Sequence, residues 1–238
     1  MALKSVVYKN STFEISYEIL NAGAELDFVL LHGWGSNKEL MRGSFAPYMK
    51  KFRHIYIDMP GFGKSSCDIV LTTADYAQIM ELFLAEIKVS KDIILGHSFG
   101  GKVATLLKPK LLVLVGSAGI FVKKSLKIRT KIALFKTLKV FGLAKFRSLF
   151  VAEDAKALSE EMYETFKNVV DEDFSEKFKS FDSKALLFWG RDDTATPLSS
   201  AESIASLMSD ATLEVYDGDH YFFMKNSADI AKKIEENF

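Results

Sequence analysis

The feature that most constrains the fold is a series of short apolar runs in which polar residues do not alternate. Such runs are typical of strands that are buried on both faces, as in a parallel sheet covered by helices. Segments with helical periodicity lie between them, the clearest at residues 73–88. The alternation of strand and helix predicts an α/β fold with right-handed crossovers. The apolar runs are residues 28–31, 55–57, 93–95, 111–115 and 185–189.

The first twenty residues follow a different pattern. Residues 5–9 and 12–19 have β character, and in the second stretch Phe13, Ile15 and Tyr17 alternate with polar residues. This alternation is typical of strands with one face toward the core. We therefore expect an antiparallel pair at the start of the sheet.

Composition excludes several classes of protein. The chain has 238 residues, of which 48% are hydrophobic and 4 are proline, as in an ordinary folded domain. Its net charge is zero, which gives no global field that would attract nucleic acid. Cys67 is the single cysteine and cannot form an internal disulfide, and the apolar runs are far shorter than the roughly 20 residues of a membrane span. We expect a cytoplasmic protein without a transmembrane segment.

About 65 residues separate the strand that ends near residue 116 from the one that begins near 184, too many for a simple loop. Residues 119–152 carry a net charge of +9 and residues 153–182 a net charge of −6. In the basic half, apolar side chains recur at helical spacing, which indicates a basic amphipathic helix. We predict a folded insertion here. The recurring apolar residues are Ile128, Ile132, Phe135 and Leu138.

The most specific motif is Gly-His-Ser-Phe-Gly at residues 96–100, a complete G-x-S-x-G between a buried strand and a helical stretch at 102–107. A nucleophilic serine on a tight turn from strand to helix needs small residues on both sides, where chain segments approach closely. Gly96 and Gly100 meet that need. Ser98 is therefore the candidate nucleophile.

A serine hydroxyl needs a histidine base that is oriented by a carboxylate. Of the four histidines, His54 lies in a predicted strand, His32 ends one, and the side chain of His97 should leave the turn in another direction. His220 follows the last predicted strand and completes the order Ser, Asp, His. Asp192 and Asp193 both follow a late strand, so the residues alone leave the carboxylate open.

In these motifs the chain resembles the α/β-hydrolases along nearly its whole length. The resemblance implies a mostly parallel eight-stranded sheet with helices on both faces, a core of residues 1–118 and 184–238, and a helical lid at 119–183 after the sixth strand. It also favours Asp193 over Asp192, because Gly190 and Pro197 have the family spacing. His-Gly-Trp-Gly at 32–35 is similar to the family segment that binds the oxyanion, which implies the backbone amides of Trp34 and Phe99.

No motif requires a cofactor or a metal. The acidic residues around the predicted site lack the spacing of a calcium loop. Residues 58–65 end in Gly-Lys-Ser, but a phosphate-binding loop would need glycine where Asp58 stands. This segment resembles a supporting loop of the α/β-hydrolases. The acidic residues are Asp192, Asp193, Asp217 and Asp219.

The resemblance implies a cofactor-free serine carboxylesterase that acts on a small-molecule ester. The segment at 32–35, the short chain and the basic insertion are similar to esterases that release the methyl ester of pimeloyl carrier protein. We expect an acidic acyl carrier protein to dock on the basic insertion through Lys127 and Arg129.

Three alternatives remain open. Trp-Gly-Arg-Asp-Asp at 189–193 also resembles a segment of carbon–carbon bond hydrolases of ring-cleavage products. A non-catalytic small-molecule receptor could use the same fold. A peripheral protein could lay its basic helix on an anionic lipid surface.

Overall fold

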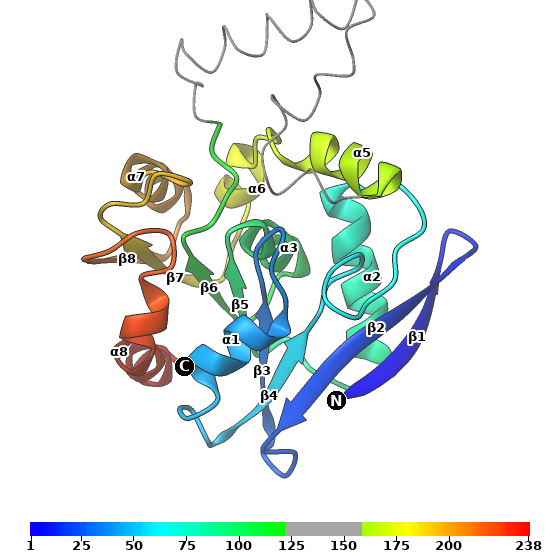
Figure 1. The fold of residues 1–238 in the computed structure, drawn as a ribbon. Helices are drawn as coiled ribbons and strands as arrows, with labels where there is room; N and C mark the ends of the chain where they lie inside the picture. Colours follow the sequence, from blue (N-terminus) through cyan, green and yellow to red (C-terminus); the bar gives the residue numbers. More distant parts are fainter. Residues whose placement is uncertain (122–158) are drawn as a thin grey trace, which may run out of the picture.

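The structure, a computed structural model, describes residues 1–121 and 159–238. Its eight strands form one sheet in the order β1-β2-β4-β3-β5-β6-β7-β8, which confirms the predicted α/β fold (Figure 1). The strands are β1 (Ala2–Tyr8), β2 (Ser11–Leu20), β3 (Leu26–Leu31), β4 (Phe52–Ile57), β5 (Ile93–His97), β6 (Leu111–Val115), β7 (Lys184–Gly190) and β8 (Ala211–Tyr216). The described helices are α1 (Lys38–Phe45), α2 (Thr73–Glu86), α3 (Phe99–Leu107), α5 (Glu160–Val169), α6 (Ser175–Lys179), α7 (Leu198–Leu207) and α8 (Phe223–Asn237).

The sheet is antiparallel only at its first edge. Strand β2 pairs antiparallel with both β1 and β4, as the alternation in the first twenty residues indicates. From β4 to β8 every neighbouring pair is parallel. The carboxyl ends of the parallel strands therefore meet at one edge of the sheet, where ligand sites form in such folds.

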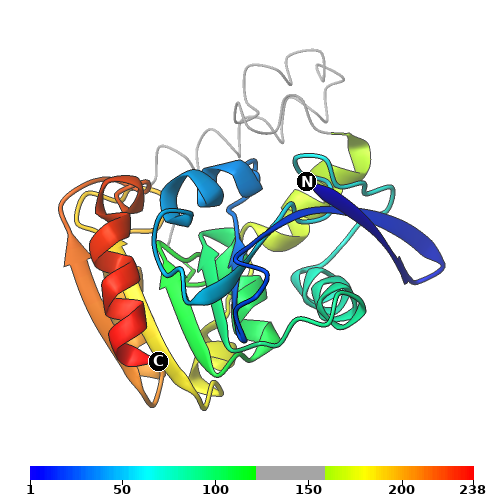
Figure 2. The ribbon, with the colours of Figure 1, turned by 90° about the horizontal axis from the view of Figure 1, so that it is seen from below.

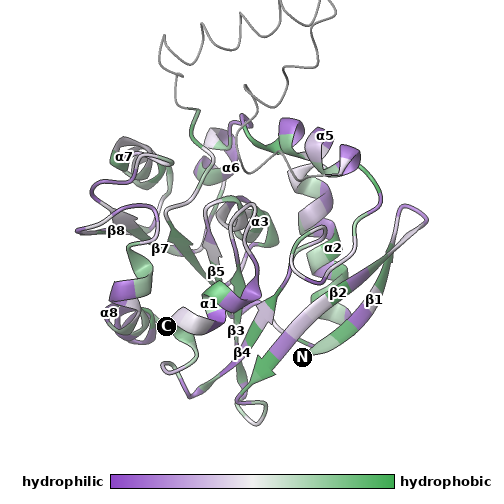
Figure 3. Ribbon diagram, in the orientation of Figure 1, coloured by the Kyte–Doolittle hydropathy of each residue, from purple (hydrophilic) through white to green (hydrophobic). Residues whose placement is uncertain are grey.

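Helices cover both faces of the sheet. Figure 2 shows α1 and α8 on one side and α2 on the other. Along β3, Phe28 and Leu30 belong to the cluster under α1 and α8, whereas Val29 and Leu31 belong to the cluster under α2, α3 and α7. Burial on both faces is the physical reason why the central strands are mostly apolar, whereas the helices combine hydrophilic and hydrophobic residues (Figure 3).

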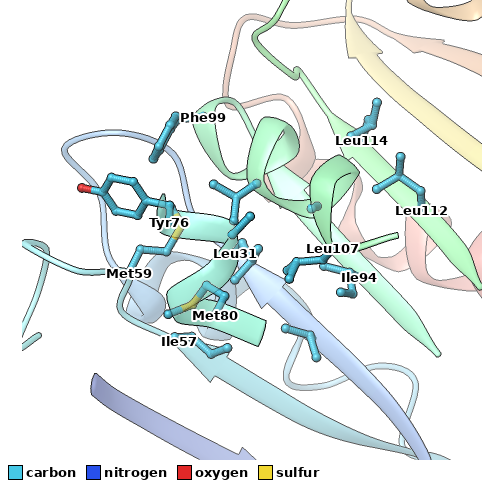
Figure 4. Packing of buried hydrophobic residues seen from close by; sticks show 14 of the residues in the cluster. Leu31, Ile57, Met59, Tyr76, Met80, Ile94, Phe99, Leu107, Leu112 and Leu114 are labelled. Carbon is cyan, nitrogen blue, oxygen red and sulfur yellow. The ribbon is translucent and has the colours of Figure 1, made fainter. Parts of the chain in front are cut away.

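The cluster under α2, α3 and α7 lies directly behind the start of α3. Figure 4 shows Tyr76 and Met80 of α2 facing Phe99 and Leu31. The rings of Tyr76 and Phe99 meet edge to face, with centroids 5.0 Å apart. Helix α2, which carries Tyr76 and Met80, begins with a reciprocal capping box between Thr72 and Asp75.

The acidic half of the insertion contains α5 and α6, which pack on the core. The amide of Leu71 donates to Thr165 Oγ1 (2.9 Å), and the amide of Phe174 donates to the Gly119 carbonyl (2.7 Å). Residues 122–158 lie outside the described part of the chain, with the predicted basic helix and with Lys127 and Arg129. The lid at 119–183 thus stays a prediction.

None of the helices that the structure describes is long and apolar enough to cross a membrane.

Candidate active site

Ser98 lies between the last residue of β5 and the first residue of α3, with φ at +51°. A Cβ on Gly96 would lie 2.3 Å from the carbonyl oxygen of Gly100, and one on Gly100 would lie 2.6 Å from that of His32. Both positions therefore require glycine, as expected. Helix α3 begins at Phe99, earlier than the stretch at 102–107 that the sequence indicates, because close packing overrides the low helix propensity of two glycines.

His220 and Asp193 meet on the loops that follow β8 and β7. Nδ1 of His220 lies 2.7 Å from Oδ2 of Asp193. The other carboxylate oxygen accepts hydrogen bonds from the amides of Ala195 and Thr196, at 2.9 Å each, and Thr196 Oγ1 donates to Oδ2. Burial alone would raise the pKa of Asp193, but these hydrogen bonds outweigh it and hold the pKa below its usual value. The carboxylate is thus ionised and fixed.

Thr196 is part of this arrangement, and the motifs did not predict it. Its side chain is 9% exposed, and Oγ1 lies within 3.4 Å of both Oδ2 of Asp193 and Nδ1 of His220. The sequence signal for Thr196 is its position in the turn after Asp193, because an Asp side chain often accepts hydrogen bonds from amides two or three positions onward.

The segment at 32–35 is fixed by the buried ring of His32. The amide of Met59 donates to Nε2 of His32 at 3.0 Å, so the ring proton is on Nδ1, which donates to the Gly33 carbonyl at 2.7 Å. Burial lowers the pKa of His32 to about 4, which keeps the ring neutral. Because the peptide is trans, the amide of Trp34 points away from that carbonyl.

The amides of Trp34 and Phe99 are the two predicted oxyanion donors. In the described ranges, neither of them donates a hydrogen bond to a protein acceptor. The Phe99 amide also opens α3, where the helix dipole favours negative charge. Both amides are therefore free to bind an oxygen in the adjoining cavity.

A cavity of about 420 Å³ brings these groups together. Ser98, His220, Trp34 and Phe99 line it, and Phe166 of α5 lines the apolar side. Ser98 Oγ donates no hydrogen bond to any described residue, whereas Nδ1 of His220 is paired to Asp193. A hydrogen bond between a catalytic serine and its histidine often tightens only in the substrate complex. The cavity thus holds a serine, a histidine paired to a carboxylate, and two free amides.

A buried lysine also lines this cavity, although lysine is normally a surface residue. Nζ of Lys102 donates to the Val169 carbonyl (2.6 Å) and pairs with Glu172 (3.1 Å). Burial lowers the pKa of Lys102, and the attraction of Glu172 opposes that shift. These contacts tie α3, the helix that follows Ser98, to the end of α5 and to the segment after it.

The remaining predicted residues lie apart from this chemistry. The side chain of Asp192 is exposed, and its amide donates to the Gly218 carbonyl. Asp58 is buried against Lys38 and accepts hydrogen bonds from the amides of Lys38 and Lys64, so its segment has a supporting role. Among residues 1–121 and 159–238 there is no cluster of three potential metal ligands.

Comparison with known proteins identifies the family of the chain. The model of the alpha/beta hydrolase family matches residues 28–233. The pimeloyl-[acyl-carrier protein] methyl ester esterase of Edwardsiella ictaluri is 39% identical over 79 residues, which are 33% of this chain and 29% of that relative. The chain thus spans less than a third of that protein's length.

Two further likenesses extend over nearly the whole chain. A 2-hydroxy-6-oxononadienedioate/2-hydroxy-6-oxononatrienedioate hydrolase of Pseudomonas putida is 25% identical over 263 aligned positions, covering 94% of this chain and 91% of that one. An esterase from Exiguobacterium antarcticum has the same fold, with a TM-score of 0.74, 21% identity, and coverage of 94% and 95%. With the family model matching most of its length, the chain belongs to the alpha/beta hydrolase family.

Proposed function

We propose that this protein is a serine hydrolase that cleaves carboxylic esters through an acyl-enzyme. The observation that carries the proposal is the 2.7 Å hydrogen bond between His220 and Asp193 beside the same cavity that Ser98 lines. A serine on a strained turn, a base and a fixed carboxylate are the groups that acyl transfer requires.

In the proposed mechanism, Ser98 Oγ attacks the carbonyl carbon of the ester while Nε2 of His220 accepts the hydroxyl proton. Asp193 holds Nδ1 of the ring and stabilises the imidazolium without taking up a proton itself. When the tetrahedral intermediate collapses, His220 gives its proton to the departing alcohol. Water then attacks the acyl-enzyme by the same route and releases the acid.

The negative charge of the tetrahedral intermediate falls on the former carbonyl oxygen. The amides of Trp34 and Phe99 are the proposed donors to it. The hydrogen bond from His32 to the Gly33 carbonyl supports this role, because it sets the orientation of the Trp34 amide. The loss of one such donor typically costs about 10²-fold to 10³-fold in kcat.

A p-nitrophenyl ester series from acetyl to long acyl chains tests the proposal with wild type and Ser98→Ala side by side. We expect hydrolysis by wild type and none by Ser98→Ala. Equal activity in both proteins would exclude Ser98 as the nucleophile. No activity in either would favour a non-catalytic receptor on this fold.

We propose further that the physiological ester is a methyl ester on an acidic acyl carrier protein. The name of the Edwardsiella ictaluri relative and the net charge of +9 over residues 119–152 support this substrate. Reversal of Lys127 and Arg129 to Glu should weaken turnover of carrier-bound ester and leave p-nitrophenyl acetate unaffected. Equal loss on both substrates would contradict docking.

The matched control is reversal of Lys50 and Lys108 to Glu, which changes the net charge equally. Both residues are exposed and precede the amino ends of strands β4 and β6, opposite the edge that holds Ser98. We expect this control to turn over both substrates like wild type. Increased binding to anionic liposomes at low salt, lost in the Lys127 and Arg129 variant, would instead support a lipid surface as the partner.

A second candidate function is cleavage of a carbon–carbon bond. The name of the Pseudomonas putida relative, whose match covers 94% of this chain, favours it. Turnover of a coloured dienol acid, measured as loss of visible absorbance, separates the two functions. Faster cleavage of this compound than of any ester in the series would replace the esterase proposal.

A further inference from the structure

The buried ring of His97 lies between two loops of the site. His97 is the last residue of β5 and directly precedes Ser98. Its ring centroid is 4.7 Å from that of His220. On the other side, a Cβ built on Gly33 would lie 3.0 Å from Nδ1 of His97. The imidazole therefore fills the space between the Gly33 loop and the His220 loop.

Within the described residues, the side chain of His97 forms one hydrogen bond, and that bond is to the residue that carries the proposed base. Nε2 of His97 lies 3.2 Å from the backbone carbonyl of His220. A carbonyl can only accept, so Nε2 carries the ring proton and Nδ1 is bare. In the described part of the chain, Nδ1 has no hydrogen-bond partner. The ring thus donates a hydrogen bond to the His220 loop through Nε2, whereas its Nδ1 side only packs against Gly33.

The charge state of His97 suits this position. The charged or titratable groups near it are His220, Asp193, His32 and Tyr221, and the ring of Phe223 also packs against it. Burial lowers the pKa of His97 to about 3, and repulsion from His220 adds to that shift. The ring is therefore neutral at neutral pH, and it does not oppose the positive charge that His220 acquires when it accepts the serine proton.

We propose that His97 is a positioning residue that holds the backbone of His220 at a set distance from Ser98. The inference rests on the proposed function, because it assigns His220 the role of base. The side chains of His97 and Ser98 leave adjacent backbone positions, so a bond from the first to the His220 loop fixes the reach of the imidazole toward the second. A displacement of about 1 Å at a reacting group can cost about 10²-fold in rate.

Four variants test this role: His97→Leu, His97→Asn, His97→Gln and the control His54→Leu. Leu removes the donor, Asn keeps an amide that is too short to reach the carbonyl, and Gln extends its amide to about the position of Nε2. His54 is a matched control, because it is also fully buried and its Nε2 also bonds a backbone carbonyl, that of Met49, at 3.0 Å. It lies on β4, away from the cavity.

The readouts are kcat and KM for p-nitrophenyl acetate, the rate at which a fluorophosphonate modifies Ser98, and the free energy of unfolding in urea. We expect His97→Leu and His97→Asn to lower kcat and the modification rate about 10-fold to 100-fold, with KM within about twofold of wild type. His97→Gln should recover most of the loss. His54→Leu should lose stability and keep its kcat.

A spectroscopic readout separates positioning from a general structural defect. The proton shared by His220 and Asp193 should give a strongly deshielded NMR signal, which should shift or broaden in His97→Leu and stay in His54→Leu. If His97→Gln is as slow as His97→Asn, or if His97→Leu keeps the kcat of wild type, the positioning role is wrong. If wild type neither hydrolyses the ester nor reacts with the fluorophosphonate, it is the proposed function that fails.

Discussion

Oδ2 of Asp193 lies 2.7 Å from Nδ1 of His220, although 27 positions separate the two residues in the chain. The side chain of Asp193 is fully buried and that of His220 is 15% exposed, so water competes little for this hydrogen bond. The bond keeps the ring proton on Nδ1 and leaves Nε2 free to accept the proton of the serine. Without the carboxylate, the ring could take the opposite tautomer.

Asp193→Asn should therefore lower kcat for p-nitrophenyl acetate by about 10³-fold or more with little change in fold. The neighbouring residue provides the control, because Asp192 is exposed and its side chain forms no contact in the cavity. Asp192→Asn should keep kcat within about twofold of wild type. Steady-state kinetics of the two variants decides which of the two adjacent aspartates orients His220. The reverse result would assign that role to Asp192.

Stability should fall between pH 6.5 and pH 4 because of buried histidines, chiefly His32 and His97. Burial lowers the pKa of His32 to about 4 and that of His97 to about 3, whereas both titrate near 6.5 in the unfolded chain. In this range the unfolded state binds more protons, so the free energy of unfolding decreases as the pH falls, by about 1.4 kcal/mol per pH unit for each group.

Urea unfolding at pH 7, 6 and 5 measures this slope. His32→Gln should make the dependence shallower, because it removes one of the three buried histidines whose pKa burial lowers, the third being His54. The buried carboxylates do not confuse the test, since a lowered pKa such as that of Asp58 affects stability only near and below pH 3.8. An unchanged slope in His32→Gln would mean that this ring is not neutral and buried in solution.

Local pattern was enough to predict the sheet and the turn that carries Ser98. The strands could be read because both of their faces are covered, so that every residue of β6 (Leu111–Val115) is buried and apolar. The turn could be read because the close approaches at Gly96 and Gly100 exclude every other residue. In both cases the constraint fixes the residue types of a short segment, even where the contacting atom is distant in the chain, as the His32 carbonyl is for Gly100.

The buried polar contacts could not be predicted in this way. His97 reaches the His220 carbonyl across 123 positions, and Lys102 reaches Glu172 across 70. Nothing near Lys102 in the sequence distinguishes it from a surface lysine, because its partners lie on a segment that the fold alone brings close. Long-range hydrogen bonds of this kind depend on how loops meet at the sheet edge, which a single sequence does not encode locally.

Breaking the ion pair between Lys38 and Asp58 by removing one partner should cost several kcal/mol of stability. Nζ of Lys38 lies 2.6 Å from Asp58, and both side chains are at most 2% exposed. Asp58→Ala leaves a buried ammonium without its partner, which should lower the free energy of unfolding by about 3–5 kcal/mol. Adding Lys38→Met should restore part of the loss.

Glu81→Ala is the comparison, because the Glu81 and Lys91 pair is similarly close at 2.8 Å but its side chains are 53% and 34% exposed. Urea titrations should show a loss of at most about 1 kcal/mol there. Similar losses for Asp58→Ala and Glu81→Ala would show that leaving Lys38 unpaired carries no burial penalty. The Asp58 pair also anchors the segment that follows Trp34, so Asp58→Ala should slow ester hydrolysis as well.

Phe166 should limit the length of the acyl chain. Its ring lies 5.3 Å from that of Trp34, and both line the cavity beside Ser98. Helix α5 is held in place by the bonds of Thr165 to Leu71 and of the Val169 carbonyl to Lys102, so the helix should not move inward to fill the space that a smaller residue leaves. Phe166→Ala should therefore enlarge the apolar side of the cavity.

The measurement is kcat/KM for p-nitrophenyl esters from butanoyl to dodecanoyl. Phe166→Ala should raise the ratio of long-chain to short-chain kcat/KM about tenfold, within the range of 1–3 kcal/mol that one apolar contact typically contributes to discrimination. Lys167→Ala, the adjacent exposed position on the same helix, should keep the ratio of wild type. If both variants keep that ratio, the acyl chain does not pass Phe166. If Phe166→Ala loses activity equally on every ester, the Phe166 ring supports the shape of the Trp34 loop and does not select the length of the acyl chain. A contact made only with the far end of the acyl group cannot affect the shortest substrate.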